Sequence, residues 1–161
     1  MKLKTRDIVY IGFIAALCAV ATTIRIEIPG GAMVHLGSAA LFTTSILFGG
    51  LYGGLGAAIG SALFDLFGGH TQYIVFSFFI KGIAGLIVGG MTAGYLPPSI
   101  NKPTASFSRI LVALIIGAIW TAFGYFIAWW FVLNSAAVAA SKIQYSLITS
   151  AAGIVVAIIL T

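Results

Sequence analysis

Long apolar stretches with almost no charge constrain this chain more than any other feature. The run from Ile8 to Ile24 contains no charged residue. Of the 161 residues, 61% are hydrophobic and 7% are charged, whereas an ordinary soluble domain has about 25% charged residues. A small domain buries only about two-thirds of its chain surface, so it cannot hide this much apolar surface from water. The composition therefore excludes a soluble or disordered chain and predicts an all-α integral membrane protein.

The net charge of +5 does not change this interpretation. Its cations are spread along an apolar chain, whereas nucleic-acid binding needs a clustered basic patch. We therefore expect the exterior of the protein to contact the lipid bilayer, and we expect no nucleic acid as a partner.

The apolar runs predict six transmembrane helices in one domain that covers residues 1–161. A spanning helix needs about 20 apolar residues. The runs at 36–50 and 53–67 are shorter, so they are either tilted partners or include a re-entrant segment. Alternating strands are not evident, so helix is expected throughout, and the first run lacks a signal-peptide cleavage site and is retained. The predicted spans are 8–25, 36–50, 53–67, 73–95, 108–132 and 141–160.

The distribution of Lys and Arg predicts the orientation of this compact six-helix bundle. With six spans both termini lie on one side of the membrane. That side holds five cations, namely Lys2, Lys4, Arg6, Lys102 and Arg109, and the other side holds Arg25 and Lys142. Cytoplasmic loops carry the excess of positive charge, so both termini are expected in the cytoplasm.

Lys81 is the most informative charged residue. It lies about 12 Å along its helix from the outer end, and an ionisable residue at that depth indicates a functional site with a partner. Tyr73 and Ser77 precede it at four-residue spacing and share its face. Asp65, at the outer end of the preceding span, is the expected charge partner. The alternative is a Lys81–Asp65 pair that only fixes helix packing.

Other polar and aromatic residues gather at the same outer end. Tyr125 and Trp129 share one face of the fifth span, and such tryptophans belong either to an interfacial belt or to a pocket for a planar ring. The candidate substrate-binding residues are Lys81, Ser77, Tyr73, Asp65, His70, His35, Tyr125, Trp129, Lys142 and Tyr145.

Motifs for catalysis are missing from the sequence. His35 and His70 have no paired-ligand spacing, so no metal site is expected. There is no nucleophile elbow and no GxxxxGK[ST] loop, so the chain cannot hydrolyse ATP by itself. We expect a protein that is not an enzyme, although Asp65, His70 or Lys81 as an acid or base is a minor alternative.

Small residues at four-residue spacing lie on several helices. Gly12, Ala15, Ala16 and Ala19 form two such pairs on the first span. The next two spans carry further pairs that include Gly56 with Gly60. Small residues let helices approach closely in lipid. They serve either packing within the bundle or docking of a partner, and the four residues of the first span are the candidate docking residues.

Two segments, 60–69 (GSALFDLFGG) and 78–89 (FFIKGIAGLIVG), resemble the substrate-binding S components of energy-coupling factor (ECF) vitamin transporters, nearest to the riboflavin-type S family. Ala15 and Ala19 resemble the AxxxA contact motif of that family. The resemblance implies capture of a water-soluble vitamin from outside, in a pocket formed by residues 27–35, residues 65–73 and the last three spans.

The same resemblance implies the partners and the location. An S component associates with a transmembrane T component and two cytoplasmic ATPases, in the bacterial cytoplasmic membrane. No cofactor is expected in this chain, and ATP is used by the partner subunits. The sequence resembles members for pyridoxine or hydroxymethylpyrimidine. A non-transporting scaffold that uses its small-residue faces is the alternative.

Overall fold

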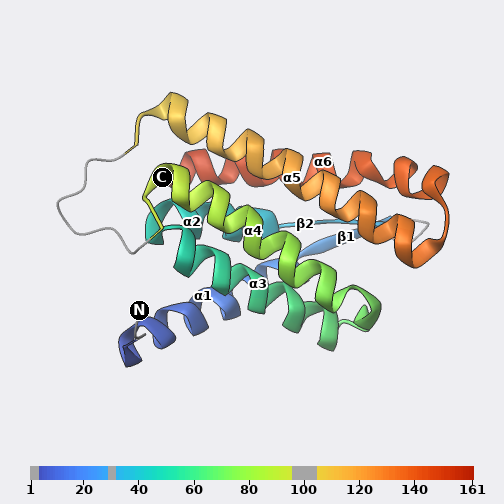
Figure 1. Cartoon of the computed structure of the whole chain (residues 1–161), viewed down its shortest axis with the longest axis horizontal. Helices are drawn as coiled ribbons and strands as arrows, with labels where there is room; N and C mark the ends of the chain where they lie inside the picture. The colour runs from blue at the N-terminus through green and yellow to red at the C-terminus, as the bar shows by residue number, and fades with distance from the viewer. Residues whose placement is uncertain (1–3, 29–31, 96–104) are drawn as a thin grey trace.

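The computed structural model describes residues 4–28, 32–95 and 105–161. Within these ranges the chain forms six α-helices that pack side by side (Figure 1). The prediction of an all-α membrane fold with six helices is confirmed. The helices are α1 Thr5–Thr23, α2 Gly37–Phe48, α3 Gly50–Phe67, α4 Ile74–Thr92, α5 Phe107–Leu133 and α6 Ala136–Leu160, with a 3₁₀ turn η1 Thr71–Tyr73 before α4.

Five of these helices are long and apolar enough to cross a membrane, and α2 is the exception. Its 12 residues rise only about 18 Å, against about 30 Å for the hydrocarbon layer. Gly49 ends α2 with a φ of 86°, a conformation that glycine adopts at no steric cost. The chain turns there and enters α3 directly at Gly50.

The segment after α1 forms a β-hairpin, so the expectation of helix throughout was wrong here. Strand β1 Arg25–Ile28 pairs antiparallel with β2 Ala32–His35, and Arg25 lies opposite His35. With four residues in each strand, the alternation is too short to stand out from the sequence. The hairpin runs along the helices, where β2 contacts α6 (Figure 1).

The last helix begins earlier than the predicted residue 141. Asn134 adopts the left-handed conformation with a φ of 51° and ends α5. The Ser135 hydroxyl then accepts a hydrogen bond from the Val138 amide at 3.3 Å and caps α6. Such a cap satisfies a backbone donor that has no partner within the helix.

Glycines bring α3 against two neighbouring helices. A methyl group at Gly60 would collide with the backbone of Ala15 and with Cys18 of α1. A methyl group at Gly85 of α4 would come within 2.6 Å of Gly54 of α3. The small-residue pairs of α3 therefore serve packing within the bundle, as one of the two alternatives expected.

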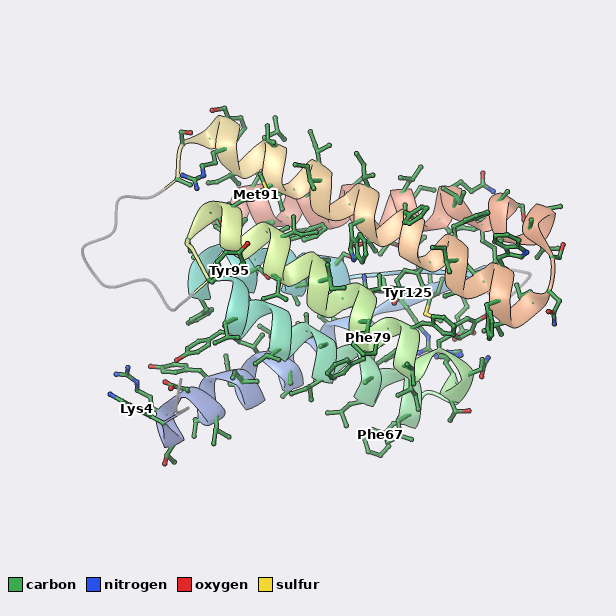
Figure 2. All side chains as sticks on the ribbon, viewed as in Figure 1. Lys4, Phe67, Phe79, Met91, Tyr95 and Tyr125 are labelled. Carbon is green, nitrogen blue, oxygen red and sulfur yellow. The ribbon has the colours of Figure 1, made fainter. Side chains whose placement is uncertain are left out.

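The two ends of the bundle hold different elements of the chain. The start of α1 and the end of α6 lie at one end, so the termini share a side as predicted (Figure 1). The η1 turn and the α5–α6 turn lie at the other end. Large apolar side chains such as Phe67 and Phe79 point away from the helices (Figure 2), as expected of a surface that faces lipid.

Candidate substrate-binding site

A cavity opens in the half of the bundle that holds the η1 turn, between the hairpin and the helices. Counting its open mouth, it holds about 750 Å³ of empty volume. Every predicted binding residue except Lys142 and Tyr145 is among the residues that line it. The lining residues are Thr22, Met33, His35, Ser38, Ser61, Phe64, Asp65, His70, Tyr73, Ser77, Lys81, Thr121, Tyr125, Trp129, Ser146 and Thr149.

Lys81 of α4 lies at the cavity wall and is only 4% exposed. Its ammonium donates a hydrogen bond to the Ser38 hydroxyl at 3.0 Å and lies 5.5 Å from the centre of the Tyr125 ring. The ring face attracts a cation at this distance. The ammonium has three donors, so the protein partners leave room for a ligand oxygen.

The expected Lys81–Asp65 ion pair does not form in the described part of the chain. Ser38 takes the place of the carboxylate because α2 starts beside the middle of α4 and directs its first turn at Lys81. The two charges still interact electrostatically. Ser38 was not predicted as a site residue, because a serine at the start of an apolar run does not by itself indicate a binding role.

Asp65 of α3 is 7% exposed, and its Oδ2 atom has no hydrogen-bond partner in the described residues. Ser77, His70 and Lys81 all interact with its carboxylate, and the Ser77 hydroxyl lies 3.0 Å from the Tyr125 hydroxyl. The Nε2 atom of His70 is also buried without a partner there. An unsatisfied buried polar atom is costly, and a ligand that enters the cavity can satisfy it.

Aromatic rings form one wall of the cavity. Tyr125 and Trp129 lie one turn apart on α5, with ring centres 5.7 Å apart and planes 31° apart. The next residue, Trp130, does not line the cavity and is 53% exposed. Trp129 therefore faces the cavity and Trp130 faces outward, and whether either serves a ring-binding pocket or an interfacial belt stays a prediction.

The hairpin closes one side of the cavity. The His35 Nδ1 atom accepts a hydrogen bond from the Gly37 amide at 3.0 Å, and the Met33 carbonyl accepts one from Thr149 of α6. Burial, together with the positive charges of Lys81 and Arg25, lowers the pKa of His35 from 6.5 to about 3. The imidazole is therefore uncharged near neutral pH.

Arg25 links the hairpin to α3 through the Phe64 ring. Its guanidinium forms an ion pair with Glu27 at 2.7 Å and lies 5.0 Å from the centre of the Phe64 ring. Phe64 lines the cavity, so the conformation of the hairpin is coupled to the cavity wall. Thr22 and Phe64 were not predicted, because only the packing of separate helices brings them here. Met33 and Ser146 lie in segments that were expected to form the pocket.

The candidate docking residues of α1 do not share one face. Ala15 is 3% exposed and packs against Gly56 and Gly60 of α3. Gly12 and Ala16 are exposed, and Ala19 is half-buried. Ala15 packs within the bundle itself in this structure. Docking through Gly12, Ala15, Ala16 and Ala19 stays a prediction.

Comparisons with known proteins identify the family. The sequence profile described as "ECF-type riboflavin transporter, S component" matches residues 2–161. A protein of Pyrococcus woesei, described as "Uncharacterized protein in gap 3'region", is 28% identical over 142 residues, which cover 88% of each chain. The solved chain of "Structure and mechanism of the S component of a bacterial ECF transporter" has the same fold, with a TM-score of 0.74 at 20% identity over 98% of this chain and 94% of that one. The chain therefore belongs to the ECF-type riboflavin transporter S component family, and it is a membrane-embedded, substrate-binding transporter subunit rather than an enzyme.

Proposed function

We propose that this chain captures a small water-soluble vitamin or precursor from outside, with pyridoxine or hydroxymethylpyrimidine as the favoured substrates. It delivers the substrate inward together with a T component and two cytoplasmic ATPases, which use ATP. One observation carries the proposal. The Asp65 Oδ2 atom, which has no hydrogen-bond partner among the described residues, and the ammonium of Lys81 line the same cavity.

The lining of the cavity supports a small ring. Ligand sites combine apolar walls with a few placed polar groups. Here Tyr125 and Trp129 supply flat faces, and buried hydroxyls of Ser38, Thr121 and Thr149 supply hydrogen-bonding groups. Substrates with ring nitrogens and hydroxymethyl groups match this combination.

The first experiment identifies molecules that stay bound to the full chain. The protein is purified in detergent and denatured, and the released small molecules are identified by mass spectrometry. Calorimetric titration with pyridoxine, hydroxymethylpyrimidine, thiamine and riboflavin follows. We expect one heterocycle to bind with one-to-one stoichiometry. Loss of binding in Lys81→Met, with binding kept in Arg109→Gln at the other end of the bundle, would support the proposed site.

The scaffold alternative makes the opposite prediction. A folded protein that binds none of these compounds but still assembles with other membrane proteins would contradict the proposed capture of a vitamin. Transport is tested separately, by uptake of labelled substrate into vesicles that contain the chain, the T component and the ATPases. Uptake that continues without ATP would contradict the proposed dependence on the partner subunits.

A further inference from the structure

Two side chains of opposite charge, Lys81 and Asp65, line the cavity without forming a direct ion pair in the described part of the chain. The Lys81 ammonium bonds to a neutral hydroxyl and faces the Tyr125 ring. The Asp65 Oδ2 atom has no hydrogen-bond partner among the described residues. A buried charge without a close partner is costly, so the cavity offers a positive and a negative site at separate positions.

Tyr125 spans the distance between these two sites. Lys81 lies over its ring face, while its hydroxyl lies 3.0 Å from Ser77, the neighbour of Asp65. A planar ring bound beside Tyr125 and Trp129 can therefore present one edge toward Lys81 and another toward Asp65, since all four side chains line the cavity.

We infer that the ligand is a hydroxypyridine bound in its dipolar form, with the ring N–H⁺ on Asp65 and the ring oxygen anion on Lys81. The inference rests on the proposed function and selects one of its two favoured substrate classes. It places pyridoxine in this site ahead of hydroxymethylpyrimidine, which is neutral and cannot carry both charges.

The charges near the site favour a ligand with no net charge. His35 is uncharged near neutral pH, and Arg25 is paired with Glu27. A cationic or anionic ring would leave either Lys81 or Asp65 without compensation. A neutral ring would offer each of them only an ordinary hydrogen bond. A dipolar ring forms two bonds in which both partners are charged, and such bonds are shorter and about twice as strong.

The absorption spectrum of bound pyridoxine tests the inference without any mutation. The dipolar form of a 3-hydroxypyridine absorbs at longer wavelength than the uncharged form, and an apolar site without charges would favour the uncharged form. We expect pyridoxine bound to the full chain to show the band of the dipolar form. A spectrum of the uncharged form would overturn the inference.

Two related compounds provide the comparison of affinities. The 3-O-methyl ether of pyridoxine keeps the ring and both hydroxymethyl groups but cannot form the ring oxygen anion. We expect it to bind at least about 10-fold more weakly than pyridoxine, as for the loss of a hydrogen bond to a charged group. Equal affinities, or tighter binding of hydroxymethylpyrimidine, would overturn the inference while leaving the proposed function intact. If no vitamin binds, the proposed function fails as well.

Asp65→Asn tests the carboxylate with little change in shape. An amide can donate to an uncharged ring nitrogen but cannot compensate a protonated one. We therefore expect bound pyridoxine to shift toward the uncharged spectrum in this variant and to bind at least about 10-fold more weakly. Asp7→Asn is the matched control, because it removes an acid at the other end of the bundle, where Asp7 accepts a hydrogen bond from Tyr52 and does not line the cavity. An unchanged spectrum in Asp65→Asn would contradict the assignment, and thermal unfolding of each variant checks that it is folded.

Discussion

The Lys81 ammonium donates a hydrogen bond to the Ser38 hydroxyl at 3.0 Å, across 43 positions of sequence. This bond joins the middle of α4 to the first turn of α2. Ser38 is 1% exposed, so water does not replace it as an acceptor. Since α2 is too short to cross the membrane alone, a polar contact at its start helps to fix its position in the bundle.

Ser38→Ala is expected to lower stability, because the buried ammonium loses its hydrogen-bond acceptor. Leaving such a group unsatisfied costs about 1–3 kcal/mol or more. The effect should be much smaller when Lys81 is already Met, so a double-mutant cycle on thermal unfolding in detergent should show coupling of about 0.5–3 kcal/mol. Ser61→Ala is the control, since Ser61 lines the cavity but does not bond to Lys81. Equal effects in both backgrounds would contradict the contact.

Gly60→Ala is expected to destabilise the bundle, whereas Gly12→Ala is not. A methyl group at Gly60 of α3 collides with the backbone of Ala15 of α1. The two helices would therefore have to move apart. Overpacking of this kind costs about 1–3 kcal/mol. A methyl group at Gly12 meets nothing within 4 Å, so the variant gains the better helix propensity of alanine, up to about 1 kcal/mol. Unfolding temperatures measured side by side would refute the packing if both variants behaved alike.

Ala15→Leu and Ala16→Leu should separate folding from assembly. The two residues are adjacent on α1 but lie on different faces, since Ala15 is buried and Ala16 is exposed. We expect Ala15→Leu to lower the unfolding temperature and weaken ligand binding. Ala16→Leu should keep both properties but reduce co-purification with the T component and the uptake of substrate. Normal assembly of Ala16→Leu would show that this face contacts only lipid.

Acidification should destabilise the protein through His35. Its pKa is 6.5 in the unfolded chain and about 3 in the folded one. Between these values the unfolded state binds a proton that the folded state does not, so stability falls as the pH falls below 6.5 and is unaffected by His35 above it. At pH 5 the loss is at most about 2 kcal/mol.

His35→Asn provides the comparison for this pH effect. The asparagine oxygen can still accept the hydrogen bond from the Gly37 amide, but the residue does not titrate. Unfolding temperatures at pH 7 and pH 5 should therefore differ less in His35→Asn than in the unsubstituted protein. Identical pH dependence in the two proteins would show that His35 is not held in its neutral form.

Much of the site was predictable because it is encoded within single helices. Ser77 and Lys81 share a face of α4, and Tyr125 and Trp129 share a face of α5. Helical spacing alone places each pair together, and the structure brings both pairs to one cavity. Whether these residues bind substrate stays a prediction, to be decided by the titrations above.

The amino-acid sequence by itself determined the membrane class, the six helices and the common side of the termini. Apolar composition selects lipid as the solvent, and lipid requires each segment to satisfy its own backbone hydrogen bonds as a helix. The face that each helix buries was decided only in the tertiary structure. Lipid is as apolar as the interior, so a helix that is apolar on all sides does not reveal its inner face. For that reason the burial of Ala15, the Ser38 partner of Lys81 and the position of the hairpin over the cavity follow only from the packing of segments that are distant in sequence.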